Sequence, residues 1–449
     1  MGSDDRRSVV GDFVTLQRGT TYRGDMVGKP GPVLLGLGSI EPGGGFREGH
    51  YKTFGGECPE KLMLHPGDIY VALKGATKDG SMIGSVARVP LSVESGRLTQ
   101  DTAKLEFTAP DLDIQRYLYW VLRTPHYREY CASRQRGTTA AALGRDDFLA
   151  YPVPGLTWAR QRLAHLLDNL EAKIELNRQT SQTLEPMARA LFKSWFVDFD
   201  PVRAKADGRD TYLASEIAGH FPGSFEESKI GVIPRGWGIR RLGDFVTLDK
   251  GLSYKGAYLG ETGMAMVNLG CFPGQGRFSQ QAIKHYSGNS AFRHRVRPGD
   301  LVVANTDITQ KREVLGSAAL VSPQVNADEL LFTHHVFAVR FRPDNEHWKL
   351  FTYFALLQDA YRERVTGFAT GTTVLALPRD ALLELRVVDP PELLVRAFGR
   401  AVSPLLERHW RAESQSSVLE AMRDELLSEL QPGSGQTLAS SGDTLGVVA

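Results

Sequence analysis

Two polar loops carry the residues best suited to recognise a nucleic acid. Each loop follows an apolar segment that begins after Pro-Gly-Asp. Asn and Gln side chains can pair with adenine and Lys or Arg with guanine, whereas Thr hydroxyls and Lys suit phosphates. An ordinary polar hairpin loop is the alternative. The candidate residues are Lys74, Thr77 and Lys78 in the first loop, and Asn305, Thr306, Thr309, Gln310, Lys311 and Arg312 in the second.

A Gly-Thr-Thr sequence also occurs twice, as Gly137-Thr138-Thr139 and Gly371-Thr372-Thr373. Arg134 and Arg136 stand directly before the first of them. Hydroxyls and backbone N–H groups of such a turn can hold a phosphate, and neighbouring basic side chains would strengthen that contact. A plain turn without a ligand is the alternative.

Both features recur because the chain contains one module twice. Gly11–Leu16 is repeated letter for letter at Gly243–Leu248, at an offset of 243 − 11 = 232 residues. Pro66-Gly67-Asp68 returns as Pro298-Gly299-Asp300 at the same offset, 298 − 66 = 232. Solenoid repeats span roughly 20–50 residues, so this period indicates a duplicated domain with its connector.

Each copy is predicted to be an α+β domain. Short apolar runs punctuated by Gly and Pro indicate strands. The predicted strands are Phe13–Leu16, Val33–Leu37, Ile69–Leu73, Ile83–Val89 and Lys104–Phe107, and then Phe245–Leu248, Met264–Leu269, Leu301–Ala304, Ala318–Val321 and His335–Phe341. One helix is predicted after each set, at Ile114–Arg123 and His347–Arg364.

A long helix is predicted behind each copy. In the first, apolar positions step by four and three residues from Leu163 to Trp195, which is the spacing of a coiled-coil seam. Pro186 should bend this helix, and Pro404 stands early in the second. We expect the two helices to pair; two amphipathic helices lying on their own domains are the alternative. The residues predicted to form the interface between the helices or with a partner are Leu163, Leu167, Leu170, Ile174, Leu184, Leu191, Phe192, Trp195, Leu419, Met422 and Leu426.

These elements define a domain plan. It comprises a first domain at residues 1–156, a long helix at 157–199, a linker at 200–235, a second domain at 236–389, a second long helix at 390–431 and a disordered tail at 432–449. The linker is rich in Gly, Pro and charge and is predicted to have a short helical piece near Tyr212–Ala218. The tail is rich in Gly, Ser and Thr, a composition that favours disorder.

Composition limits the class of protein. A chain of 449 residues with a net charge of +1 is long enough for two or three domains. A strong phosphate binder that works alone usually carries a basic excess, so any DNA contact should be local or shared with partners. Cys58, Cys131 and Cys271 match no metal spacing and favour a reducing cytosol. No apolar run approaches the ~20 residues of a membrane span, and we expect a cytoplasmic protein without a metal.

The sequence contains no set of residues that predicts catalysis. Asp389-Pro390-Pro391-Glu392 is similar to the Asp-Pro-Pro-aromatic signature of amino-methyltransferases, but Glu392 replaces the aromatic residue. Proline there also suits the opening of a helix. Two further groups lack a complete metal or nuclease site, namely His334-His335, and Asp344 with Glu346 and Lys349.

The chain resembles a known family, the specificity subunit of type I restriction–modification systems. The segment Leu184–Val202 looks like the central conserved region of that family almost throughout, and Ile230–Trp237, followed by Leu242–Asp244, also fits. Both Gly-Thr-Thr turns agree. The resemblance covers the whole chain except about the last 18 residues, which composition marks as disordered.

The resemblance implies two target-recognition domains separated by two long helices in an antiparallel, pseudo-twofold pair. Each domain would read one half of a bipartite, asymmetric double-stranded DNA site, and the helices would set the spacer between the halves. They would also dock two modification (methyltransferase) subunits, which carry S-adenosylmethionine and methylate adenine at N6. Restriction subunits would add ATP- and Mg-dependent cleavage and translocation. The chain itself would then hold no cofactor and would not be an enzyme.

Two rival functions remain open from the sequence. One is a protein-interaction scaffold that reads no DNA. The other is a fused methyltransferase or nuclease, which would need a cofactor pocket of its own.

Overall fold

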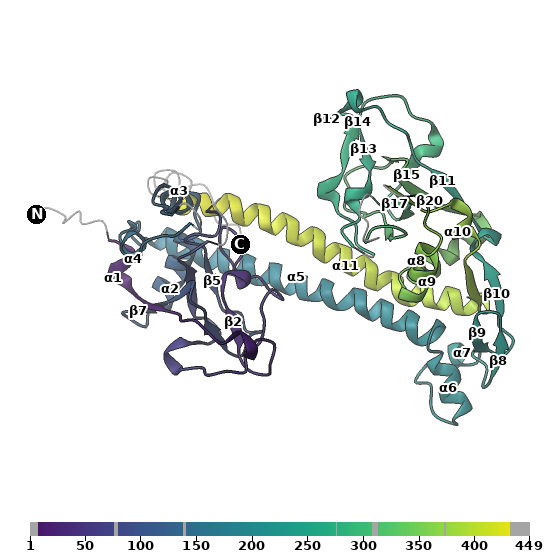
Figure 1. The fold of residues 1–449 in the computed structure, drawn as a ribbon, viewed down its shortest axis with the longest axis horizontal. Helices are drawn as coiled ribbons and strands as arrows, with labels where there is room; N and C mark the ends of the chain where they lie inside the picture. The colour runs from purple at the N-terminus through teal and green to yellow at the C-terminus, as the bar shows by residue number, and fades with distance from the viewer. Residues whose placement is uncertain are drawn as a thin grey trace, which may run out of the picture. The chain divides into compact units, whose positions relative to one another are not determined.

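The computed structural model describes residues 8–75, 80–137, 141–274, 276–307, 313–371 and 374–431 (Figure 1). These residues form two compact units. Unit 1 comprises those within Met1–Leu176 and Ser416–Ala449, and unit 2 those within Asn177–Gln415. The predicted tail at 432–449 lies outside the described residues.

Unit 1 is built on a four-stranded antiparallel sheet of order β1-β7-β4-β5. A smaller sheet of order β2-β6-β3 accompanies it. The strands are β1 Val14–Arg18, β2 Val33–Leu35, β3 Met63–Leu64, β4 Ile69–Ala72, β5 Val86–Arg88, β6 Gly96–Leu98 and β7 Thr102–Phe107. The helices are α1 Val10–Phe13, α2 Leu112–Val121, α3 Pro125–Ser133 and α4 Arg145–Leu149, followed by the start of α5 Trp158–Phe196.

Unit 2 contains a sheet with the corresponding order, β11-β20-β16-β18, and a five-stranded sheet β12-β14-β13-β19-β15. Its strands are β10 Gly238–Arg241, β11 Val246–Lys250, β12 Leu259–Gly260, β13 Met264–Val267, β14 Lys284–Tyr286, β15 Arg295–Val296, β16 Leu301–Ala304, β17 Thr306–Asp307, β18 Ala318–Leu320, β19 Leu330–Phe332, β20 Val336–Phe341, β21 Leu375–Ala376 and β22 Arg386–Asp389. Its helices are α8 Lys349–Leu356, α9 Asp359–Thr366 and α10 Arg379–Leu383, then α11 Glu392–Leu427.

The repeated residues make the same local structures in both units. Asp12 accepts a hydrogen bond from the Val9 N–H at 2.8 Å, and Asp244 accepts one from the Arg241 N–H at 3.0 Å. The glycine of each Pro-Gly-Asp turn has a positive φ, 93° at Gly67 and 85° at Gly299. Glycine adopts this conformation without the steric cost that a side chain adds, and the turn then leads into β4 or β16.

The predicted strands are present with shifted ends, but the small sheets were only partly foreseen. Strands β3, β6, β12, β14, β15 and β19 were not predicted, and most are only two or three residues long. Such segments carry too little alternation to be recognised. The helix predicted at His347–Arg364 is wrong as a single element, because α8 ends at Leu356 and α9 begins at Asp359.

The predicted linker folds as part of unit 2. It contains α6 Asp200–Ala206, α7 Ser215–Ala218 and the hairpin of β8 Phe225–Ser228 with β9 Gly231–Pro234. Val202, Phe221 and Ile233 are buried in the main core of the unit. These apolar side chains are isolated between polar and glycine-rich stretches, so composition alone predicted a linker.

Helices α5 and α11 contact each other within unit 2 through polar and aromatic side chains. Asn177 donates to Gln415 at 3.0 Å, and Ser181 Oγ lies 2.8 Å from His409 Nδ1. Phe192 and Phe398 have ring centroids 5.6 Å apart. Residue numbers rise along one helix as they fall along the other, so the two segments run antiparallel. Both helices continue through Pro186 and Pro404.

Most of the predicted helix interface is at least half buried. Leu167, Leu170, Phe192 and Trp195 are buried, and Leu163, Ile174, Leu184, Leu191, Leu419 and Leu426 are half buried. Met422, which was predicted to contact either the other helix or a partner, is 46% exposed, whereas Leu427 and Leu430 are buried in the unit 1 core. Met422 lies five residues before Leu427, which places it about 140° away around the helix.

Candidate nucleic-acid interface

In unit 1 the residues directly after β4 pair with residues that flank the Gly-Thr-Thr sequence. The Gly75 N–H donates to the Ala141 carbonyl at 2.8 Å, and Lys74 forms a β-bridge with Ala142. Arg136 and Ala142 exchange two backbone hydrogen bonds of 3.0 and 2.9 Å. Ala142 therefore forms β-bridges with residues of both motifs.

Unit 2 repeats this arrangement. Strand β17 pairs with β21, so that Thr306 opposes Ala376. Thr370 and Ala376 exchange backbone hydrogen bonds of 2.9 and 2.8 Å, as Arg136 and Ala142 do in unit 1. Gly371 has a φ of 107°, close to the 102° of Gly137. Each unit thus brings its two predicted recognition motifs together. We call the region around these paired residues the reading tip: Lys74, Arg136 and Ala142 in unit 1, and Thr306, Thr370 and Ala376 in unit 2.

The reading tip of unit 1 presents basic side chains. Arg136 is 74% exposed and forms an ion pair of 2.7 Å with Asp147. Lys74 is 45% exposed, and its Nζ lies 3.8 Å from Asp101 Oδ1. The guanidinium of Arg134 stacks on the Tyr130 ring at 3.7 Å. Because exposed ion pairs contribute little to stability, these cations can exchange their protein partners for phosphates.

The reading tip of unit 2 is held by hydrogen bonds. Thr306 is half buried, and its Oγ1 lies 2.8 Å from His335 Nδ1. Burial lowers the pKa of His335, and the neighbouring charges of His334 and Lys250 lower it further.

Asn305 does not fit its predicted role as a base reader. The residue is 3% exposed, and its amide donates to the His334 carbonyl at 3.1 Å. Its backbone N–H donates to the His335 carbonyl at 2.9 Å. Asn305 therefore supports the tip from behind. A polar residue at the end of a strand carries no sequence signal that distinguishes these two roles.

Several predicted contacts cannot be placed, because they lie outside the described residues: Thr77, Lys78, Thr138, Thr139, Thr309, Gln310, Lys311, Arg312, Thr372 and Thr373. The described neighbours define where these segments start and end. Asp307 accepts hydrogen bonds from the N–H groups of Val314 and Leu315 at 2.8 and 3.3 Å. This buried carboxylate joins described residues on either side of 308–312.

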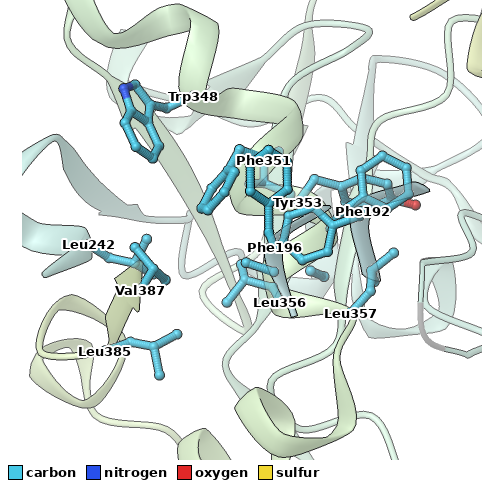
Figure 2. Close-up of a cluster of buried hydrophobic side chains, with 14 of the residues drawn as sticks. Phe192, Phe196, Leu242, Trp348, Phe351, Tyr353, Leu356, Leu357, Leu385 and Val387 are labelled. Carbon is cyan, nitrogen blue, oxygen red and sulfur yellow. The ribbon is translucent and has the colours of Figure 1, made fainter. Parts of the chain in front are cut away.

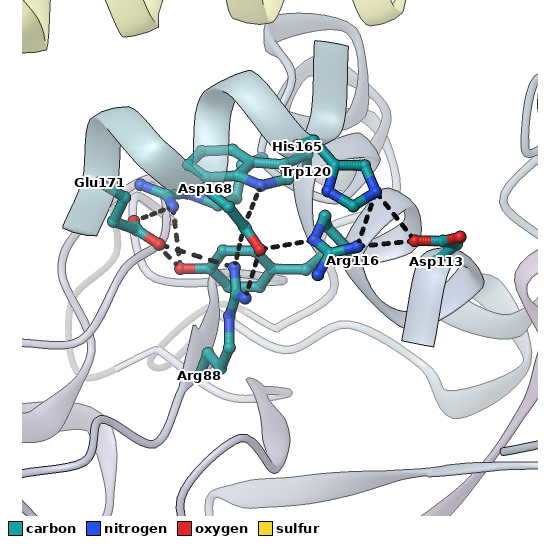
Figure 3. A network of polar contacts seen from close by, with 9 residues as sticks. Arg88, Asp113, Arg116, Trp120, His165, Asp168 and Glu171 are labelled. Carbon is teal, nitrogen blue, oxygen red and sulfur yellow. Dashed lines mark hydrogen bonds and ion pairs between the residues drawn. The ribbon is translucent and has the colours of Figure 1, made fainter. Parts of the chain in front are cut away.

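A polar network attaches the unit 1 domain to helix α5 (Figure 3). Asp168 accepts two hydrogen bonds from Arg88, at 2.6 and 3.0 Å. It also accepts one from Arg116 at 2.8 Å and one from the Trp120 indole at 2.7 Å. Glu171, one turn further along α5, binds Arg123. No sequence pattern indicated this network, because its members lie far apart in the chain.

Aromatic packing makes the corresponding attachment in unit 2. Figure 2 shows Phe192 and Phe196 of α5 beside Phe351 of α8. The Phe192 ring lies 5.3 Å from that of Phe351 and 6.1 Å from that of Phe354. Unit 2 is therefore fastened to its helices by an apolar cluster, whereas unit 1 combines the buried Leu167 and Leu170 of α5 with a polar network.

The residues considered for catalysis lie at the ends of secondary-structure elements or in an ion pair. Asp389 ends β22, and after two prolines Glu392 begins α11, as a proline-opened helix would. Lys349 forms an exposed ion pair with Glu346 at 2.6 Å. In the described part of the chain, no three His, Cys, Asp or Glu side chains are grouped to hold a metal. Nor does any described helix have the length and apolar character needed to cross a membrane.

Comparison with known proteins identifies related chains. No family model matches the sequence. The type I restriction enzyme MjaIX specificity subunit of Methanocaldococcus jannaschii is 24% identical over 361 residues, covering 77% of this chain and 75% of that protein. The HindI specificity subunit of Haemophilus influenzae is 25% identical over 316 residues, covering 61% of this chain and 66% of that one.

A solved structure shares the fold. The S subunit of a type I restriction–modification system from M. genitalium superposes with a TM-score of 0.60 and 15% sequence identity, over 96% of this chain and 98% of that one. The predicted resemblance is confirmed: this chain is a homologue of proteins named type I restriction enzyme specificity subunits, and the solved S subunit shares its fold.

Proposed function

We propose that this chain is the DNA-reading subunit of a type I restriction–modification complex, and that each reading tip recognises one half of a bipartite site. The observation that carries the proposal is the duplicated tip. In both units the segment after the Pro-Gly-Asp strand pairs with the segment after the Gly-Thr-Thr turn. The framework is repeated while the side chains differ, as expected of two readers of different sequences.

Chemistry of the tips favours DNA over a protein partner. Lys74, Arg134 and Arg136 are exposed or half exposed in unit 1 and can contact phosphates or guanine. Thr306 offers a hydroxyl in unit 2. The net charge of +1 fits a reader that shares its phosphate contacts with partners.

Helices α5 and α11 are proposed to form the antiparallel coiled coil that sets the spacer. Helix α5 has 39 residues, which at ~1.5 Å per residue give about 58 Å, more than one DNA turn of about 34 Å. Polar residues within the contact, such as Asn177 and Gln415, would fix its register.

The same helices are proposed to dock two modification subunits and, through them, restriction subunits. S-adenosylmethionine, ATP and Mg would then belong to the partners. This chain would contribute recognition and geometry, without a catalytic step of its own.

The proposal predicts that the basic tip of unit 1 contributes to DNA affinity. We expect the double variant Lys74→Ala with Arg136→Ala to weaken DNA binding by the complex with its modification subunits. If both side chains contact phosphates, the slope of log affinity against log salt should become shallower by about 2. Fluorescence anisotropy at several salt concentrations measures both quantities.

A matched control removes two exposed, ion-paired cations elsewhere. Lys193 and Arg209 are 57% and 64% exposed and pair with Asp198 and Asp207. Their double alanine variant should keep the wild-type slope. An equal loss of slope in both variants would reveal a general effect of charge and would contradict a role for the tip.

A further inference from the structure

The two tips share a structural position that the two units fill with different chemistry. Lys74 and Thr306 correspond at the offset of 232, since 306 − 74 = 232, and each pairs with the alanine after its Gly-Thr-Thr turn. Each also contacts one side chain on the neighbouring segment. That side chain is Asp101 for Lys74, at 3.8 Å, and His335 for Thr306, at 2.8 Å.

The partners Asp101 and His335 are themselves equivalent. The Asp101 carbonyl accepts a hydrogen bond from the Leu73 N–H at 3.1 Å, and the His335 carbonyl accepts one from the Asn305 N–H at 2.9 Å. Both residues stand just before the strand that pairs with β4 or β16, namely β7 or β20. The backbone hydrogen bond is therefore equivalent in the two units, while the side chains that meet there differ.

These pairs restrain the first side chain of each tip. Asp101 draws the Lys74 ammonium toward the protein and offsets its charge. His335 fixes the direction of the Thr306 hydroxyl, which otherwise rotates freely between partners. A group that is held in place presents one pattern of donors and acceptors to a base, which is the basis of discrimination between bases.

We propose that Asp101 and His335 are positioning residues that help to determine which bases each unit accepts. The inference rests on the proposed function, because it assigns a specificity role within the reading tips. It implies that the Lys74–Asp101 pair affects one half of the DNA site and the Thr306–His335 pair the other.

The test uses the complex with its modification subunits and a plasmid library randomised in both half-sites. Sequencing of methylated adenines gives the preference for each base. His335→Phe removes the hydrogen bond to Thr306 and should reduce discrimination about tenfold at positions in one half-site. His335→Gln retains a group that can bind the hydroxyl and should restore the wild-type preference.

Asp101→Asn should change preferences in the other half-site by about threefold.

Controls separate positioning from folding. His285→Phe alters a half-buried histidine of β14 outside the tip and should leave both half-sites unchanged. Should His335→Phe fail to assemble with its partners, Thr306→Val removes the same hydrogen bond from the other side and is expected to give the same change.

The outcomes distinguish this inference from the proposed function. A wild-type complex without a bipartite preference would overturn the proposed function itself. Given a bipartite wild-type preference, the positioning role is wrong if His335→Phe leaves both halves unchanged or alters both equally. It is also wrong if His335→Gln is as impaired as His335→Phe.

Discussion

Replacement of Asp168 by asparagine is expected to destabilise unit 1 locally by about 2–3 kcal/mol. The substitution removes the carboxylate on which Arg88, Arg116 and the Trp120 indole converge, while the Asp168 side chain is only 20% exposed. Removal of one partner from a buried ion pair leaves the other charges uncompensated, which costs about 3–5 kcal/mol when burial is complete. The partial exposure places this site below that range.

Hydrogen–deuterium exchange is the suitable measurement, because a two-unit chain need not unfold in one transition. The opening free energy of peptides from α2 and β5 should fall in the variant, and that of unit 2 peptides should not. As a matched control, Asp25→Asn removes the partner of Arg23 in a pair whose side chains are 58% and 80% exposed. That variant should change stability by less than about 1 kcal/mol.

The same network predicts a dependence of stability on pH. Burial alone would raise the pKa of Asp168, but hydrogen bonds and charge from Arg88, with bonds from Trp120 and Arg116, outweigh it and lower the pKa. A carboxyl with a lowered pKa stabilises the fold above its unfolded pKa of about 3.9. This stabilisation is lost as the pH falls through the folded-state pKa. Unit 1 should therefore lose stability below about pH 4, and more steeply in the wild type than in Asp168→Asn.

Truncation of Phe192 to alanine is expected to destabilise unit 2 by about 3–5 kcal/mol, the usual cost of deleting a buried phenylalanine ring. Phe192 is 1% exposed and contacts rings from α5, α8 and α11; Figure 2 shows those of α5 and α8. Its ring centroid lies 5.4 Å from that of Phe196, 5.3 Å from that of Phe351 and 5.6 Å from that of Phe398. The variant should expose peptides of α8 and the start of α11 to hydrogen exchange.

Met187 provides the control on the same helix. It is 52% exposed, so Met187→Ala should change stability by no more than about 0.5 kcal/mol. If Phe192→Ala left exchange in α8 unchanged, the aromatic cluster would not be what fastens unit 2 to the helix.

Repetition was the strongest source of prediction from the sequence. It located both Pro-Gly-Asp turns and the strands of the two four-stranded sheets, because glycine conformation and strand alternation are local properties. The meeting of Lys74 with Ala142 was not foreseen. Those residues are far apart in the chain, and their pairing depends on the three-dimensional path between them.

The errors have the same physical origin. Asn305 was predicted to face a base, but tertiary contacts bury it against the His334 carbonyl. The Asp168 network escaped prediction because its partners come from α2, α5 and β5. Each case turns on which face of an element meets the core, which local spacing does not specify.

The central claim is that unit 1 and unit 2 each read one half of a DNA site. The most direct measurement is single-molecule sequencing of adenine methylation in host DNA, with the gene intact, with the gene deleted, and with residues 1–156 replaced by the matching domain of another specificity subunit. If each unit reads one half-site, deletion abolishes one bipartite methylated motif and the exchange alters only one half of it. A set of methylated motifs that is unchanged by both manipulations would contradict this claim.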